Sequence, residues 1–382
     1  MEQKTGITVA AVIIIILAVA AAYIGTQPAA PTTTPTTVTP TTTATATTTA
    51  TTTATATTTT TTIPTAPVQK LRIALVLNGY RDWPGWYNEA NQAAIGVMET
   101  HGHTVDYAED VQFADQERVL NELAAEGYDL IWGHSGAFDF TLPTVADAYP
   151  NTRFFITGGR LTAYPNVISI DQAWRDTEFI KGALAAMVSE TDVVGYQIGE
   201  PYPTVLDESL AFKVGAKYVK PDITVLTSTL GNWWDIESAK EAALGMIDQG
   251  ADVVAGWAGS ADRGIGTAAE ERDVYYIASD MDHYALFPDA LGSTTYSFTP
   301  NIEEVLQNMK ADSWVSGNRL YGIASTDPPG QYIDFIFNED MLSASILDQV
   351  SNIRQEVISA NGVGLLLPTE DWWEPLAEYI PR

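Results

Sequence analysis

From residue 71 onward, short apolar and often β-branched runs alternate with amphipathic stretches, and this alternation limits the fold more than any other feature. A repeated strand and helix builds parallel sheets with helices on their faces. The runs expected to be strands are 71–77, 104–108, 129–132, 153–157, 167–170, 193–197, 224–228, 253–256 and 274–278. The stretches expected to be helices are 88–100, 116–126, 177–188, 205–219 and 236–249. The sequence therefore predicts an α/β protein with doubly wound parallel sheets.

The number of strands indicates two lobes, because nine strands over roughly 310 residues are too many for one modest sheet. We expect lobe 1 to contain residues 69–189 with part of 292–330, and lobe 2 to contain residues 190–291 with the C-terminal part. The chain is expected to cross between them near Ser189–Asp192. Two α/β lobes of this kind predict a cleft that closes on a small solute.

The N-terminal residues 1–25 contain an apolar run, residues 7–24, that follows Lys4. A helix of this length extends roughly 27 Å, which is enough to cross a thin bilayer. The run is longer than the apolar region of most signal peptides, so we favour a retained transmembrane anchor over a cleaved signal. Lys4 on the short tail before it predicts that everything downstream lies outside the cell.

Residues 26–68 consist almost entirely of threonine, alanine and proline and carry no charge. Such a segment has almost no side chain able to build a core, and it predicts an extended low-complexity stalk. The threonines are either sites of O-glycosylation or part of a bare spacer. In both cases the stalk separates the membrane from the folded domain.

The composition excludes several classes of function. The chain has 19 Lys and Arg against 48 Asp and Glu, a net charge of −29, so its field repels phosphate backbones and argues against nucleic-acid binding. It has 0 cysteines and 4 histidines, which leaves no thiolate nucleophile and little material for a metal site. We therefore expect no metal and no cofactor.

Aromatic and acidic residues concentrate in the loops that follow the expected strands, where parallel sheets bind their ligands. Trp86 and Trp233, one from each lobe, are candidates to stack on a flat ring, and Asp280 is a candidate acceptor with Asp282 as its alternative. Each also has a structural interpretation, because a tryptophan can cover a helix start and an acid can cap one. The same loops supply the other candidate ligand-binding residues, which are Asp82, Asn88, Ser135, Tyr202 and Trp257.

An enzymatic interpretation rests on the loop at 133–137, Gly-His-Ser-Gly-Ala, which is similar to the nucleophile elbow of serine hydrolases except for its last residue. Ser135 would then require His283, the one histidine downstream of it. Only two expected strands precede the loop, and no His-Gly oxyanion sequence lies near the first strand. We therefore expect a protein that is not an enzyme.

Several strings, taken in their order and spacing, resemble one known family. They are Gly127–Gly133, Tyr149–Phe154, Pro165–Val167, Ala211–Ala216, Asp248–Val253 and Ser279–Met281. Together they resemble the basic membrane protein family of ABC-transporter substrate-binding proteins, several of which bind purine nucleosides. The resemblance covers residues 71–299 and implies a type I periplasmic-binding-protein fold, in which three crossovers join two doubly wound lobes around the ligand.

The resemblance also implies roles for individual residues. The two aromatic residues of the family's site fall on Trp86 and Trp233, and the acid that binds ribose hydroxyls falls on Asp280. The proline that follows the second aromatic motif is missing, and Tyr296 stands where many members have a lysine. A purine nucleoside, a free purine base and another small ring compound therefore all remain open.

These observations lead to one functional hypothesis and one alternative of the same kind. The sequence predicts an extracytoplasmic, membrane-anchored receptor that captures a purine-like solute by cleft closure and delivers it to an ABC permease. The alternative is a sensory solute receptor that docks on a signalling partner, which the lack of a cytoplasmic signalling domain disfavours.

Overall fold

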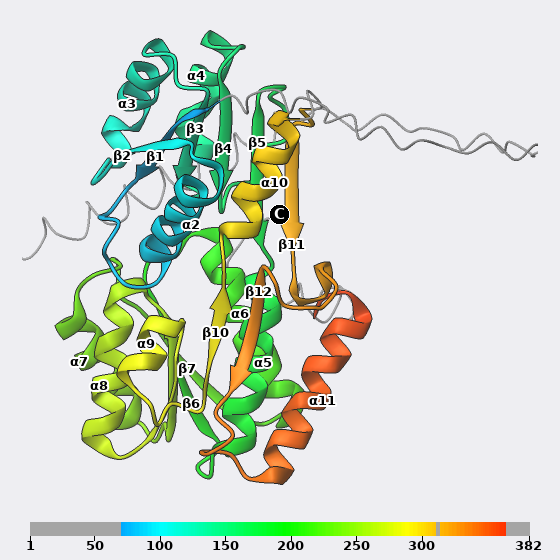
Figure 1. The fold of residues 1–382 in the computed structure, drawn as a ribbon. Coiled ribbons are helices and arrows are strands. Elements are labelled where there is room, and N and C mark those ends of the chain that lie inside the picture. The colour runs from blue at the N-terminus through cyan, green and yellow to red at the C-terminus, as the bar shows by residue number, and fades with distance from the viewer. Residues whose placement is uncertain (1–69, 311–313, 364–382) are drawn as a thin grey trace, which may run out of the picture. The chain divides into compact units, whose positions relative to one another are not determined.

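The computed structural model describes residues 70–310 and 314–363 (Figure 1). The predicted anchor at 1–25 and the predicted stalk at 26–68 lie outside the described residues. Within the described part of the chain, none of the helices combines the length and the apolar character needed to cross a membrane.

The first lobe is built on a parallel six-stranded sheet with the order β11-β5-β4-β3-β1-β2. The strands are β1 Arg72–Leu77, β2 Thr104–Ala108, β3 Leu130–His134, β4 Arg153–Thr157, β5 Val167–Gln172 and β11 Gly317–Tyr321. Every residue of β1 after Arg72 is apolar and buried, as expected of a strand covered on both faces. The direction of winding reverses between β1 and β3, so ligands are expected beyond the carboxyl ends of these two strands.

Helices cover both faces of this sheet. They are α2 Trp86–His101, α3 Phe113–Ala125, α4 Phe138–Ala148 and α10 Thr299–Lys310. α2 packs against α10, which is far away in sequence, and α3 packs against α4 (Figure 1). α2 ends where Gly102 adopts a left-handed conformation (φ 67°), which glycine does without steric cost.

The second lobe contains a parallel sheet with the order β7-β6-β8-β9 and an antiparallel pair, β10 and β12. The strands are β6 Val193–Ile198, β7 Thr224–Thr229, β8 Val253–Trp257, β9 Tyr275–Ile277, β10 Gly292–Tyr296 and β12 Ile333–Phe337. A single bridge between Ala278 and Ser293 links the pair to the parallel sheet. The winding reverses between β6 and β8, which repeats the arrangement of the first lobe.

The helices of the second lobe include two that approach each other closely. The helices are α5 Trp174–Val188, α6 Pro203–Val219, α7 Ile236–Ile247, α8 Asp262–Arg272, α9 Met281–Leu286 and α11 Ala344–Ala360, with short 3-10 turns at Gly259–Ala261 and Ile323–Ser325. A Cβ on Gly182 of α5 would lie 1.9 Å from the Phe212 carbonyl oxygen, and one on Gly215 of α6 would lie 1.9 Å from that of Phe179. The two helix backbones can touch only because glycine has no side chain.

The chain passes between the lobes three times, after β5, between β10 and α10, and between β11 and β12. The predicted fold class, two doubly wound parallel-sheet lobes, is confirmed. The first crossing differs from the expected one at Ser189–Asp192, because α5 precedes that point and yet packs on α6 and α11. The sequence pattern at 177–188 predicts a helix but does not say which of two sheets the helix covers, and α5 is buried on nearly all sides.

Candidate functional site

The four strand ends at the two points of reversed winding define the candidate site. In the first lobe β1 is followed by Asn78 and β3 ends at His134, and in the second lobe β6 is followed by Gly199 and β8 ends at Trp257. Side chains from both lobes meet there, and hydrogen bonds to Asp282 Oδ2 join the lobes directly, the shorter of them donated by the Gly85 N–H at 2.6 Å.

Trp86, the first residue of α2, lies in an aromatic cluster at this place. Its ring stacks on His134 at a centroid distance of 4.5 Å and contacts the edge of Phe298 at 4.9 Å. The backbone of Gly158, in the loop after β4, leaves room for the indole, since a Cβ there would lie 3.2 Å from the Trp86 ring. Trp86 is therefore half-buried in the first lobe, with its ring held on two sides.

His134 fixes the position of Trp86 through hydrogen bonds as well as stacking. Its Nε2 lies 2.9 Å from the Trp86 carbonyl oxygen, so this nitrogen carries the proton and donates. Its Nδ1 lies 2.8 Å from Thr157 Oγ1 and accepts from that hydroxyl. Complete burial lowers the pKa of His134 to about 3, so the ring is neutral at physiological pH. His134 acts here as a neutral support for the indole.

Trp174 links Trp86 to the second lobe. Its ring centroid lies 5.8 Å from that of Trp86, 4.7 Å from that of Trp257 and 4.8 Å from that of Tyr296. We name the rings of Trp86, His134, Trp174, Trp257, Tyr296 and Phe298 the aromatic cluster. The structure thus brings two predicted residues, Trp86 and Trp257, into one group, joined by a tryptophan that the sequence analysis missed.

Trp233, the second predicted stacking residue, lies in a separate group of the second lobe. Its Nε1 donates to Glu200 Oε2 at 2.7 Å, and the Tyr202 hydroxyl donates to the same oxygen at 2.7 Å. The two rings are nearly parallel, with an interplanar angle of 19° and a centroid distance of 6.4 Å. Burial and the nearby Glu200 carboxylate raise the pKa of Tyr87 of the first lobe. The Glu200 carboxylate of this group therefore acts electrostatically on Tyr87, the residue next to Trp86 in the chain.

Asp280 caps α9 and pairs with a histidine. Its Oδ1 accepts from the backbone N–H of His283 at 2.9 Å and lies 2.8 Å from His283 Nδ1. Burial alone would lower the pKa of His283, but the carboxylates of Asp280, Asp262 and Asp282 raise it to about 9. The sequence analysis offered two interpretations of Asp280, a ligand acceptor and a helix cap. In the structure Asp280 caps α9 through Oδ1.

Asp282 and Asn88, both predicted, form the contact between the lobes. Asp282 Oδ2 accepts from the Gly85 N–H and from Asn88 Nδ2, the latter at 3.4 Å. Of the remaining predicted residues, Asp82 is exposed, and Ser135 Oγ accepts from the Ala137 N–H at 3.1 Å. No hydrogen bond between Ser135 and His283 occurs in the described residues, and the two side chains belong to different lobes.

Sequence reasoning missed Trp174, Phe298 and Glu200 as site residues. Trp174 follows β5 by two residues and Phe298 follows β10 by two. The strand-end rule would have found Trp174 had β5 been given its full length, and Phe298 had β10 been predicted. Glu200 sits in a predicted loop, but its bond to Trp233 depends on how two loops meet. Within the residues that the structure describes, there is no group of three or more His, Asp or Glu side chains able to hold a metal ion.

Glu89 makes the stability of the folded protein depend on pH. Burial and the nearby carboxylates of Asp282 and Asp280 raise the pKa of Glu89 from 4.5 to about 7. The folded state therefore holds a proton that the unfolded state releases, so this contribution is complete below pH 4.5 and declines as the pH rises to 7. We expect Glu89→Gln to flatten the decline in the free energy of unfolding between pH 5 and 7.5, measured by urea denaturation.

A matched control for this prediction lies on the same helix. Glu99 of α2 is exposed, and Glu99→Gln should leave the wild-type pH dependence in place. If the free energy of unfolding of Glu89→Gln declined with pH as steeply as that of the wild type, Glu89 would not be the group that causes the decline.

Comparisons with known proteins match this chain to one family. The family model described as ABC transporter substrate-binding protein PnrA-like matches residues 70–363. A purine-binding protein of Brucella abortus is 29% identical over 224 residues, which cover 56% of this chain and 63% of that protein. A putative ABC transporter glucose-binding protein of Haloferax volcanii is 26% identical over 284 residues, 72% of this chain and 69% of that protein.

Solved structures agree on the fold. The crystal structure of an ABC transporter solute-binding protein from Aeropyrum pernix superimposes with a TM-score of 0.68 at 18% identity, covering 76% of this chain and 92% of that one. The match to the Brucella protein spans less than two thirds of its length, whereas the family model spans nearly all the residues that the structure describes. The chain belongs to the PnrA-like basic membrane protein family of ABC transporter substrate-binding proteins.

Proposed function

We propose that the protein captures a purine nucleoside or another purine-like molecule between its two lobes, outside the cell, and delivers it to an ABC permease. One observation carries the proposal: aromatic rings from both lobes form a continuous cluster where the winding of each sheet reverses. Flat heterocycles stack on such rings. The similarity to a purine-binding protein supports the same class of ligand. In this proposal residues 1–25 anchor the chain and residues 26–68 form a stalk.

Cleft closure supplies the working step. In the closed arrangement Asp282 accepts from the Gly85 N–H and from Asn88, so the lobes are bonded to each other next to the aromatic cluster. A ligand that contacts both lobes binds this form more tightly than an open one and shifts the population toward it. The permease then recognises the closed form. The step needs no covalent chemistry.

Isothermal titration calorimetry and thermal denaturation of the protein test the proposal. Adenosine and adenine represent the purine class, and D-glucose represents the ligand named for the Haloferax relative. A purine at a hundred times its Kd should stabilise the protein by about 2.7 kcal/mol through mass action. Stabilisation by D-glucose with no response to either purine would reject the purine class and leave a sugar receptor in its place.

Replacing Trp233 with alanine tests the second stacking residue. If Trp233 covers one face of the ring, Trp233→Ala should weaken adenosine binding by about 1–3 kcal/mol, the size found for bases stacked on aromatic side chains. The neighbouring Trp234 is 59% exposed and provides the control, because Trp234→Ala removes an indole from the same loop. If the two variants bound adenosine equally well, Trp233 would stabilise its own loop and would not stack on the ligand.

A further inference from the structure

Glu89 lies on the side of the first lobe that meets the second lobe. It belongs to the first turn of α2 and directly follows Asn88, whose amide donates to Asp282 Oδ2. Gly85, just before the helix, donates its N–H to the same oxygen, and a Cβ on Gly85 would lie 2.3 Å from Asp280 Oδ2. The start of α2 therefore lies against the two acids of α9, and the carboxylates of both act on Glu89 across this contact.

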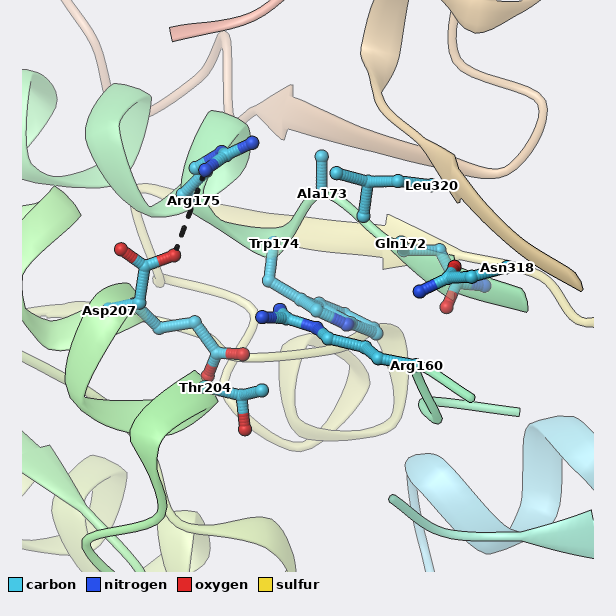
Figure 2. A pocket seen from close by; sticks show the side chains of 10 residues that line it. Arg160, Gln172, Ala173, Trp174, Arg175, Thr204, Asp207, Asn318 and Leu320 are labelled. Carbon is cyan, nitrogen blue, oxygen red and sulfur yellow. Dashed lines mark ion pairs between the residues drawn. The ribbon is translucent and has the colours of Figure 1, made fainter. Parts of the chain in front are cut away.

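The lobes also face each other beside the hinge, where the charges are balanced. A pocket of about 200 Å³ lies there between the lobes. Arg160 Nε donates to Asp171 Oδ2 at 3.1 Å, and Arg175 Nη1 lies 4.0 Å from Asp207 Oδ2, the pair marked in Figure 2. Burial raises the pKa of Glu208 well above its usual range, so this carboxyl group keeps its proton. Closing the lobes therefore brings no uncompensated carboxylates together beside the hinge.

The contact around Glu89 is not balanced in this way. None of the ion pairs between the described residues joins an arginine or a lysine to Glu89, Asp280 or Asp282. His283 is protonated, because the nearby acids raise its pKa to about 9, but its Nδ1 pairs with Asp280 inside the second lobe. In the closed form Glu89 therefore lies near the carboxylate of Asp282, which accepts hydrogen bonds from uncharged donors and has no cation as its partner.

The other ionisable groups around α2 are uncharged or occupied elsewhere. Burial lowers the pKa of His134 and raises that of Tyr296, so both are neutral at physiological pH. Asp262 of α8 is buried in the second lobe, where His283 acts on it whether the lobes are open or closed. The groups of α10, β2 and the loop before α2 have other partners: Glu303 and Lys310 contact His101, Glu304 pairs with Arg319, Asp106 and Tyr107 bond to Tyr128 and Asn91, Arg81 pairs with Glu109, and Asp82 is exposed. Glu89 is thus the group whose charged neighbours change when the lobes separate.

We propose that closing the lobes makes Glu89 take up a proton, so that the receptor captures its cargo more tightly in acidic surroundings than at neutral pH. The inference rests on the proposed function, because it concerns the regulation of the same closing step. With the lobes apart, Glu89 faces water in place of the acids of α9 and ionises more readily. In the closed form two carboxylates, those of Glu89 and Asp282, repel each other until one is protonated. The proton therefore acts as a second ligand of the closed form.

The pH range follows from the pKa of Glu89 in the two forms. Burial and the carboxylates of Asp282 and Asp280 raise it from 4.5 to about 7 in the closed form, and opening the lobes lets it fall toward 4.5. Affinity is then highest at and below pH 4.5, declines as the pH rises to about 7 and is constant above that. Each pKa unit between the forms changes the affinity tenfold. Because Glu89 is partly exposed and solvent screens it, we expect a loss of about tenfold between pH 5 and 7.5.

Isothermal titration calorimetry with adenosine on the full chain, between pH 5 and 7.5, tests the inference. The wild type should lose about tenfold in affinity over this range. Near pH 6 its binding should take up protons, so that the measured enthalpy varies with the ionisation enthalpy of the buffer. Glu89→Gln, which replaces the carboxyl group by an uncharged amide, should bind adenosine with the same affinity at every pH. Glu99→Gln, at an exposed position of the same helix, should follow the wild type.

A measurement without cargo separates this inference from the purine proposal. The chain contains 0 cysteines, so Glu117→Cys on α3 and Glu241→Cys on α7, both at exposed positions, allow one pair of fluorescent dyes to be placed across the lobes. Energy transfer between the dyes should report more of the closed form at pH 5 than at pH 7.5. Adding Glu89→Gln to the labelled chain should abolish this difference.

The two measurements have distinct outcomes. If the wild type bound adenosine as tightly at pH 7.5 as at pH 5, or if Glu89→Gln weakened with pH as the wild type does, the inference would be overturned and the purine proposal upheld. If adenosine did not bind at any pH, the purine proposal would be rejected and the energy transfer would decide. A pH dependence that Glu89→Gln abolishes would then support the inference, and transfer that stays constant with pH would overturn it.

Discussion

Replacing Lys181 with methionine is expected to lower the free energy of unfolding by about 3–5 kcal/mol, the cost of leaving a buried charge without its partner. Lys181 and Glu178 are fully buried in α5, with Nζ 2.7 Å from Oε1. The second oxygen of Glu178 accepts from the Tyr196 hydroxyl at 2.7 Å. Without the ammonium group, the carboxyl group must either stay charged in an apolar interior or take up a proton. Urea denaturation at pH 7 measures the loss.

The double variant Glu178→Gln/Lys181→Met separates the charge from the packing. It removes both charges at nearly constant volume, and buried pairs replaced in this way often lose little stability. We expect it to recover most of what Lys181→Met loses. A single variant as stable as the double one would show that the ammonium group is not needed to compensate Glu178.

The second large effect is expected at the contact between the lobes. Gly85 has a φ of 75°, and a Cβ there would lie 2.3 Å from Asp280 Oδ2. Gly85→Ala must therefore displace the loop from α9 and lengthen the bond from its own N–H to Asp282. A hydrogen bond to a charged group contributes about 1.5–3 kcal/mol, so we expect adenosine affinity to fall by at least about tenfold. Calorimetry measures this change.

Gly102, at the other end of the same helix, is the control for the backbone. It has a φ of 67°, but its nearest neighbour, Lys70 Cε, would lie 3.9 Å from the new Cβ. Gly102→Ala should lose about 1 kcal/mol of stability through the left-handed conformation. Gly85→Ala should lose more stability than Gly102→Ala, because Gly85 combines a φ of 75° with a ψ of −121° and its new Cβ meets Asp280. Only Gly85→Ala should lose affinity. If both variants bound adenosine like the wild type, the bond between Gly85 and Asp282 would not belong to the closing step.

The parallel strands were predictable because a strand that is buried on both faces has a continuous apolar sequence. All nine expected strands occur with bounds within two residues of the expected ones, and β5 and β8 extend further, to Gln172 and Trp257. The part of the chain after residue 292 was not assigned to elements. There β11 reads Gly-Asn-Arg-Leu-Tyr, a half-exposed edge strand whose pattern no rule separates from a loop.

The site was predictable in its location and only partly in its contacts. The strand-end rule found Trp86, Trp257 and Asp282, because reversed winding brings those loops together in any sheet of this order. It could not show that Trp174 would join the two tryptophans, since that contact depends on the angle between the lobes at the hinge. Nor could it show that Asp282, rather than Asp280, would bond to the opposite lobe.

The late position of β11 in the chain has a consequence for biosynthesis. β11 pairs with β5 and completes the edge of the first sheet, yet every parallel strand of the second sheet precedes it in the sequence. During translation, or export as an unfolded chain, one edge of β5 therefore stays unpaired until β11 is available. By that stage the second lobe already has all of its parallel strands. Such an edge recruits other strands. A chain that stalls before Gly317 is exposed to aggregation in a way that a complete chain is not.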